Sequence, residues 1–131
     1  MIGLDTNVLL RYLLQDDEAQ GEKASRAISQ AASRNEPLLI SLVVLCEAVW
    51  VLESAYGYRK ARLISVLDEL LETGGFEIAQ RDIVREALDD YRASKADFAD
   101  CLIGRTNESQ GCDHTLTFER PLKALETFRV L

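Results

Sequence analysis

Five acidic side chains occupy positions where carboxylates could carry out chemistry. Asp5 ends the apolar run MIGLD, Glu47 interrupts the apolar stretch SLVVLCEAVWVLES, Asp97 and Asp100 lie in ADFADCLIG, and Glu119 follows TLTF. Converging carboxylates repel one another by about 4 kcal/mol per pair at ~4 Å and an effective dielectric of about 20. A divalent cation offsets this repulsion, and oxygen ligands without histidine or cysteine suit Mg²⁺ or Mn²⁺. Because such an ion activates water and stabilises a phosphoryl transition state, these acids point to phosphoryl chemistry.

Glu47 is the most informative of the five because its helical neighbours are apolar. The residues three and four positions away are Val43, Val44, Trp50 and Val51, so we expect its side chain to face a cleft and not a wet surface. The alternative is a helix that is apolar on all sides, from which Glu47 reaches solvent or pairs with an arginine. If the acids form a metal site, at least one carboxylate should have a raised pKa without the ion.

The other acids also have ordinary structural explanations. Asp5 and Asp97 stand where helices should begin and could serve as N-caps, and Asp100 would lie in a first turn, where the helix dipole favours negative charge. Asp97 and Asp100 are spaced i, i+3 and share a helix face, and the apolar helical neighbours of Asp100 indicate that it points inward. Glu119 alone would be an ordinary turn residue.

Short apolar strands that alternate with helices should position these acids. We expect strands at residues 1–5, 38–40, 76–79, 114–118 and 128–131, and helices at residues 6–14, 16–34, 42–55, 63–71, 83–91 and about 97–109. This alternation is typical of an α/β structure with a mainly parallel sheet, whose sites lie at the carboxyl ends of the strands. Asp5 and the segment Thr117–Glu119 fall at such ends.

Composition narrows the class of protein. The 131 residues, 47% hydrophobic and 28% charged, are typical of one globular domain spanning residues 1–131. A net charge of −7 argues against a passive nucleic-acid binder and is compatible with an acidic enzyme that binds cations. No apolar run reaches the ~20 residues of a membrane span, and MIGLDTN is not typical of a signal peptide. Three cysteines without a CxxC pair indicate reduced thiols in the cytoplasm, and the single histidine, His114, argues against a histidine zinc site or a histidine-activated nucleophile.

Four sequence blocks together resemble a known family. GLDTNVLLRYL, the acid-containing LVVLCEAVWVLE, DFADCLI and TLTFER occur in the order seen in PIN-domain ribonucleases, and the chain is most similar to the VapC-type toxins of bacterial toxin–antitoxin pairs. The resemblance implies a three-layer α/β/α sandwich around a mainly parallel sheet of about five strands. It also implies cleavage of single-stranded RNA with Mg²⁺ or Mn²⁺.

The resemblance also implies roles for the acids. Asp5 and Asp100 would hold the principal ion with help from Asp97, while Glu47 would orient or deprotonate the attacking water or ligate the ion. Glu119 stands where the family usually has aspartate, so its carboxylate is displaced by about one bond length. Two hydroxyls, Thr6 and Thr117, match positions near the acids and could orient water on the metal.

An acidic nuclease needs local positive charge to hold RNA. Arg59, Lys60 and Arg62 cluster in YRKAR, and Arg11 and Arg105 follow the acidic motifs, although such clusters are more often solvated surface. The resemblance further implies a homodimer and a cognate antitoxin that occupies a hydrophobic groove. The apolar residues of the first helix could contribute to that groove, although core packing is the default; they are Val8, Leu9, Leu10, Leu13 and Leu14.

The sequence fits three other classes of protein to different degrees. A PIN fold that binds RNA or protein with little nuclease activity remains open because of Glu119. A haloacid-dehalogenase-like phosphatase would need an aspartate at position 7, where this chain has Asn7, and a downstream catalytic lysine. A P-loop NTPase is excluded because no GxxxxGK[ST] motif occurs.

Overall fold

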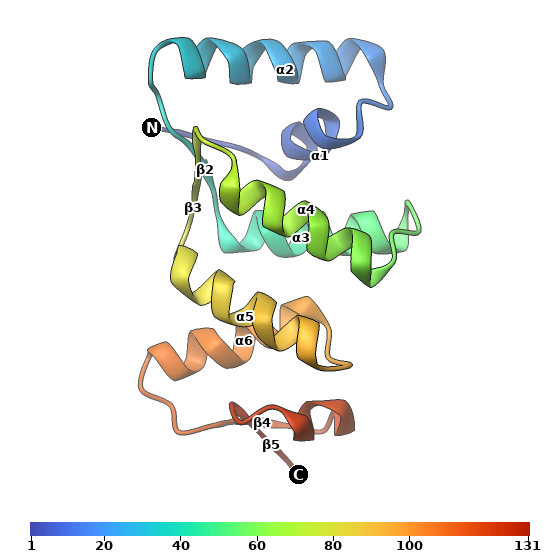
Figure 1. Ribbon diagram of the computed structural model, residues 1–131, viewed down its shortest axis with the longest axis vertical. Coiled ribbons are helices and arrows are strands. Elements are labelled where there is room, and N and C mark those ends of the chain that lie inside the picture. The colour runs from blue at the N-terminus through green and yellow to red at the C-terminus, as the bar shows by residue number, and fades with distance from the viewer. The chain divides into compact units, whose positions relative to one another are not determined.

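The computed structural model describes residues 1–131, which divide into two compact units, Met1–Ala79 and Gln80–Leu131. Figure 1 shows the elements of each unit. The first unit contains β1 (Ile2–Gly3), α1 (Thr6–Leu14), α2 (Glu18–Ser33), β2 (Leu38–Ile40), α3 (Leu42–Ser54), α4 (Lys60–Glu72) and β3 (Phe76–Ile78). The second contains α5 (Arg81–Ala93), α6 (Phe98–Ser109), β4 (Thr115–Thr117), the 3₁₀ helix η1 (Arg120–Ala124) and β5 (Phe128–Val130).

The first unit is built on a parallel sheet with strand order β1-β2-β3. Ile2 pairs with Leu38, and Leu38 pairs with Phe76, so neighbouring strands run in the same direction and end at the same edge. α1 starts directly beyond the carboxyl end of β1, and α3 directly beyond that of β2. The sheet therefore brings the starts of α1 and α3 to one edge.

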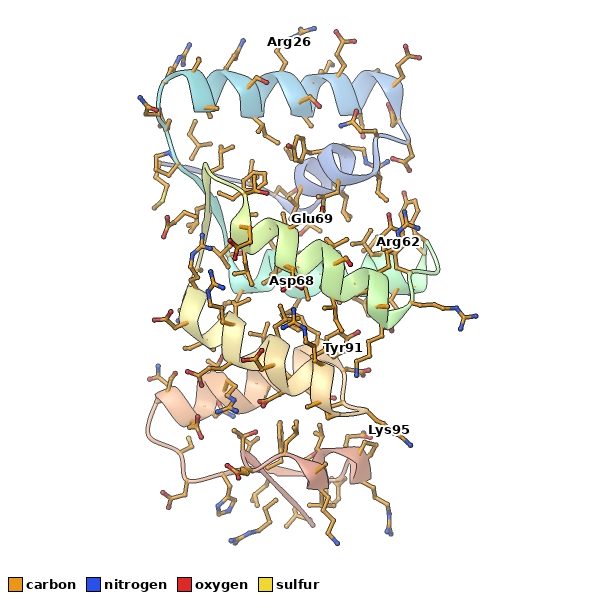
Figure 2. The ribbon with its side chains drawn as sticks, viewed as in Figure 1. Arg26, Arg62, Asp68, Glu69, Tyr91 and Lys95 are labelled. Atoms are coloured by element: carbon orange, nitrogen blue, oxygen red, sulfur yellow. The ribbon has the colours of Figure 1, made fainter.

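Small residues allow α2 to lie close against α1. Gly21, Ala24 and Ala31 are buried on one face of α2, and a Cβ at Gly21 would come within 2.9 Å of the Gln15 side-chain oxygen. On the opposite face, Arg26 points away from α1 (Figure 2) and pairs with Glu22. The amphipathic pattern expected for residues 16–34 is confirmed.

The second unit packs two helices and a two-stranded parallel sheet. The rings of Tyr91 on α5 and Phe98 on α6 meet edge to face with centroids 5.8 Å apart. α6 approaches the start of β5 at Gly104, where a Cβ would lie 2.5 Å from Thr127 Oγ1 and 2.6 Å from the Phe128 ring. Glycine suits this position because a larger residue would force the Thr127 and Phe128 side chains to move.

The expected helices and strands are all present. The five strands pair only in parallel, three in the first unit and two in the second, as the α/β reading predicted. The 3₁₀ helix η1 was not predicted. The three cysteines are free, as expected, and no helix is long and apolar enough to cross a bilayer.

Candidate active site

Asp5 lies at the carboxyl end of β1, as predicted. It occupies the N-cap position of α1 with extended backbone angles, but its side chain makes no capping hydrogen bond. The same chain caps other helices in the ordinary way: Asp17 accepts from the Gln20 N–H at 2.9 Å, and Ser41 from the Val44 N–H at 3.2 Å. The exposed Asp5 carboxylate is therefore not used to cap the helix that it precedes.

Glu47 is held by a hydroxyl from another helix. The buried Thr6, first residue of α1, donates from Oγ1 to Glu47 Oε1 on α3 at 2.8 Å. The starting points of α1 and α3 at one sheet edge explain how residues 41 positions apart meet. The sequence placed Thr6 near the acids, and the structure shows that its contact is with Glu47.

The expectation that Glu47 faces away from solvent was wrong. Its carboxylate is exposed, and its neighbours Val43 and Trp50 are each 69% exposed. The buried face of α3 is the opposite one, formed by Val44, Leu45, Ala48 and Leu52. Because α3 carries apolar residues on all sides, its sequence pattern could not show which side faces the core.

Three acids of the second unit form what we term the Asp100 group: Asp97, Asp100 and Glu119. Burial raises the pKa of Asp100, and the negative charges of Asp97 and Glu119 raise it further. The expectation that one candidate carboxylate has a raised pKa is thus confirmed at Asp100. Asp97 and Glu119 are each close enough to Asp100 to repel it, which their separation in sequence did not establish.

Asp97 and Glu119, like Asp5, precede helices that their side chains do not cap. Asp97 occupies the N-cap position of α6 and Glu119 that of η1, and neither side chain makes a capping hydrogen bond. The Glu119 backbone N–H instead donates to Thr117 Oγ1 at 3.0 Å, so this hydroxyl shapes the turn that carries Glu119. The capping explanation considered for Asp5 and Asp97 is therefore not supported by a hydrogen bond at either residue.

The donor chemistry of these residues fits a hard divalent cation. All candidate ligands are carboxylate or hydroxyl oxygens, and a cation near the Asp100 group would relieve the repulsion that raises the Asp100 pKa. No ready-made group of three or more histidine, cysteine, aspartate or glutamate ligands is present. The acids supply suitable oxygen donors without a closed coordination shell.

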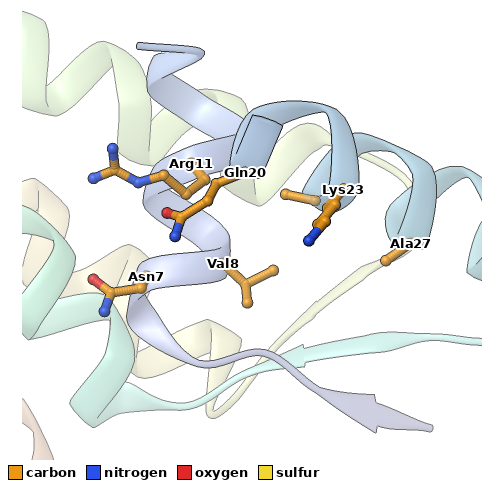
Figure 3. Close-up of a pocket in the computed structure, with 7 residues that line it drawn as sticks. Asn7, Val8, Arg11, Gln20, Lys23 and Ala27 are labelled. Atoms are coloured by element: carbon orange, nitrogen blue, oxygen red, sulfur yellow. The ribbon is translucent and has the colours of Figure 1, made fainter. Parts of the chain in front are cut away.

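Arg11, one of the expected RNA contacts, is already engaged within the first unit. Its guanidinium donates to Asp16 Oδ1 at 2.7 Å and to the Tyr56 hydroxyl at 3.3 Å, and Tyr56 donates to Asp16 Oδ2 at 2.8 Å. Arg11 also lines a largely apolar groove of about 280 Å³ between α1 and α2 (Figure 3). The remaining lining residues are Asn7, Val8, Gln20, Lys23, Ala24 and Ala27.

The YRKAR cluster lies where α4 begins. Arg59 is exposed at the N-cap position, Lys60 is the first helical residue, and the Arg62 guanidinium stacks 3.9 Å from the centroid of the Tyr58 ring. An arginine stacked on an aromatic ring keeps its charge and its outer N–H groups accessible. These residues remain candidates for RNA contact.

Arg105 has a structural role that the sequence did not reveal. It donates to both Asp90 oxygens at 2.7 and 2.9 Å, to Glu108 at 3.1 Å and to Glu86 at 3.3 Å. We term these four residues the Arg105 network. Its donors are directed at three carboxylates, and hydrogen bonds to Asp90 and Glu108 raise its pKa. We therefore omit Arg105 from the proposed RNA contacts.

Sequence reasoning missed a group of cations near the C-terminus. Arg120, Lys123 and Arg129 line a hollow of about 450 Å³ in the second unit, together with Phe128, Val130 and Leu131. Arg120 directly follows Glu119. The available signal was three basic residues within the last twelve positions, in a chain whose net charge is −7.

Comparison with known proteins identifies the family. The model of the PIN domain family matches residues 2–126. The chain belongs to the PIN domain family. The match runs through both units, and the PIN fold class agrees with the α/β reading and its parallel strands. A VapC ribonuclease of Aquifex aeolicus (strain VF5) is 27% identical over 122 residues, covering 93% of this PIN domain chain and 90% of that protein. No solved structure is matched.

Proposed function

We propose that this PIN domain protein is a metal-dependent endoribonuclease and the toxin of a toxin–antitoxin pair. Membership of the family and similarity to a VapC ribonuclease support this function. The observation that carries it is that four of the five candidate acids do not cap the helices at whose starts they lie. Asp5, Asp97 and Glu119 occupy N-cap positions without capping, and Asp100 is held among like charges.

We propose that Asp5, Asp97 and Asp100 bind Mg²⁺ or Mn²⁺. When bound, the ion would stabilise negative charge on the phosphate and lower the pKa of a coordinated water. Glu119 adds negative charge to the same group, since it acts electrostatically on Asp100. Asp97 and Glu119 thus keep the local potential negative, which favours cation capture.

Glu47 is suited to handle the attacking water. The hydrogen bond from Thr6 fixes Oε1, so Oε2 can accept a hydrogen bond or a proton from a water. In the proposed reaction, the water oxygen forms a bond to phosphorus and its proton passes to the carboxylate. The opposite P–O bond of the RNA backbone breaks, and the leaving ribose oxygen keeps the electron pair and takes a proton from solvent. Thr6 therefore acts through Glu47, as a positioning residue.

We also propose that the protein acts in the cytoplasm as a homodimer with a cognate antitoxin. The free cysteines suit a reducing compartment. The groove between α1 and α2 is the candidate antitoxin surface, because its lining is largely apolar and Lys23 gives it positive charge. An amphipathic segment that carries acidic residues would match both properties.

The mechanism is tested by cleavage of an RNA panel with Mg²⁺, Mn²⁺ or EDTA. Asp5→Asn and Glu47→Gln should each lower the cleavage rate by at least about 100-fold. Glu53→Gln is the matched control, because Glu53 is an exposed glutamate of the same helix. Cleavage that persists in EDTA, or full activity in both site variants, would show the mechanism to be wrong.

A PIN-fold binding module with little nuclease activity is the second candidate, favoured by glutamate at position 119. It predicts RNA binding without cleavage and no toxicity on expression. Glu119→Asp distinguishes the two: a gain of cleavage only in this variant would indicate a binding module whose last acid is misplaced. Cleavage by the wild-type protein would rule the module out.

A further inference from the structure

Helix α3 presents an apolar strip on the same face as Glu47. We term Val43, Glu47 and Trp50 the Glu47 strip, because these residues follow one another at i, i+4 and i+7 along one side of the helix. Val43 and Trp50 are each 69% exposed, whereas Val44, Leu45, Ala48 and Leu52 are buried on the other side. Trp50 is the only tryptophan of the chain, so its surroundings can be observed separately.

An exposed indole one helical turn from a candidate catalytic carboxylate is suited to ligand contact. Tryptophan combines a large apolar ring with one polar N–H, and it is enriched among residues that dominate binding surfaces. The core does not require Trp50, since the opposite face of α3 already packs into the unit. The side chain is therefore available for a ligand of the first unit.

Glu47 limits what can cover this strip. A dry apolar partner, such as a helix of a second copy, would bury the carboxylate between Val43 and Trp50 with only the Thr6 hydrogen bond. Burying a charge with unpaired oxygens is costly. A nucleobase avoids this cost, because it offers a flat face to the indole and amino or imino N–H donors to the carboxylate.

We propose that Trp50 stacks on a base of the single-stranded RNA substrate, beside the phosphate on which Glu47 acts. The proposal rests on the proposed ribonuclease function and adds a substrate-binding residue to it. Stacking on an aromatic ring tolerates any base, so Trp50 contributes affinity and places the strand without selecting a sequence. Only unpaired bases present a free face, and the contact therefore selects single strands.

Trp50 fluorescence tests the contact without cleavage. Wild-type protein in EDTA is titrated with a single-stranded RNA of about 12 nucleotides of mixed sequence, and with the same RNA annealed to its complement. We expect the single strand to quench Trp50 emission and the duplex to leave it unchanged. Equal effects of both forms, or quenching by neither, would overturn the proposal.

Variants separate stacking from general hydrophobic contact. Trp50→Leu should weaken binding of a labelled single strand by about 5- to 100-fold and raise KM with little change in kcat, while Trp50→Phe recovers most of the affinity. Val43→Ala is the control, since it alters the same strip without removing a ring. Equal affinity of Trp50→Leu and wild type would overturn the stacking proposal.

Two further outcomes distinguish failure of the Trp50 proposal from failure of the proposed nuclease function. In the first, wild-type protein cleaves RNA, but without RNA its Trp50 emission is blue-shifted and depends on protein concentration. A second copy then covers the Glu47 strip, so the stacking proposal fails while the nuclease function stands. If single-stranded RNA quenches Trp50 but no metal permits cleavage, the stacking contact stands and the nuclease function fails.

Discussion

The second unit contains two groups of acids, one neutralised by an arginine and one without a basic partner. In the Arg105 network, one guanidinium binds Asp90 through two hydrogen bonds and also reaches Glu86 and Glu108. In the Asp100 group, Asp97, Asp100 and Glu119 form no ion pair, and burial together with the charges of Asp97 and Glu119 raises the Asp100 pKa. An arginine thus neutralises the acids that join α5 to α6, whereas the acids of the Asp100 group have no such partner.

Glu47 in the first unit represents a third arrangement. It forms no ion pair, and the Thr6 hydroxyl orients it. The Asp100 group concentrates negative charge, whereas at Glu47 a hydrogen bond fixes the orientation of a single carboxylate. This division agrees with the proposed roles, in which the Asp100 group attracts a cation and Glu47 accepts a proton.

Removing the arginine of the Arg105 network should have the largest effect on stability. Arg105→Ala should lower the free energy of unfolding by about 2 kcal/mol, because it leaves the half-buried Asp90 without its two hydrogen bonds. Arg26→Ala, which breaks an exposed pair with Glu22, should cost less than about 0.5 kcal/mol. Urea denaturation measures both. Equal losses would mean that the network is an ordinary surface contact.

Removing the hydroxyl that orients Glu47 should have an intermediate effect. Thr6→Val keeps the shape of the buried side chain and should lower kcat about 10-fold with little change in KM. Thr6→Ser retains the hydroxyl and serves as the control, so it should keep most of the activity. If Thr6→Val is as active as wild type while still folded by circular dichroism, Glu47 does not need this hydrogen bond.

Relieving the repulsion in the Asp100 group should have the smallest effect. It should raise the free energy of unfolding, whereas Arg105→Ala should lower it. The Asp100 pKa is raised above its ordinary value of 3.8, so the folded state binds the proton more tightly than the unfolded state does. Stability therefore falls as the pH rises from about 3.8 through the raised value, and it stays lower at neutral pH. Asp100→Asn should raise the free energy of unfolding at pH 7 in EDTA by about 0.5–1 kcal/mol.

The gain from Asp100→Asn should disappear at pH values below the unfolded pKa, where the carboxyl is protonated in both states. Asp113→Asn is the control, because Asp113 is exposed and lies outside the Asp100 group. A loss of stability in Asp100→Asn at neutral pH would contradict the repulsion between these acids.

The sequence predicted the elements better than the directions of side chains. Amphipathic α2 and α5 were identifiable because their apolar residues recur at helical spacing, and the short strands because they are bounded by turn residues. η1 was missed because a five-residue 3₁₀ helix with proline near its start has no periodic pattern. The exposed side of α3 was assigned wrongly because residues such as Val43 and Trp50 are apolar on the side away from the core.

Partners distant in sequence were also beyond prediction. Arg105 and Asp90 are 15 positions apart on different helices, and their pairing depends on how α5 packs on α6. The acids themselves were found because a charge in an apolar stretch or after a strand is visible without tertiary information. Their hydrogen bonds and mutual repulsion required the structure.

The distribution of the acids along the chain bears on how such a protein is synthesised. Asp5 and Glu47 belong to the first unit, while Asp97, Asp100 and Glu119 belong to the second, and Glu119 precedes only η1 and β5. On the proposed function, a nascent polypeptide lacks part of its acid set until the second unit has been synthesised. A polypeptide that stopped after the first unit would carry Asp5 and Glu47 without any residue of the Asp100 group, and on the proposed function it should not cleave RNA.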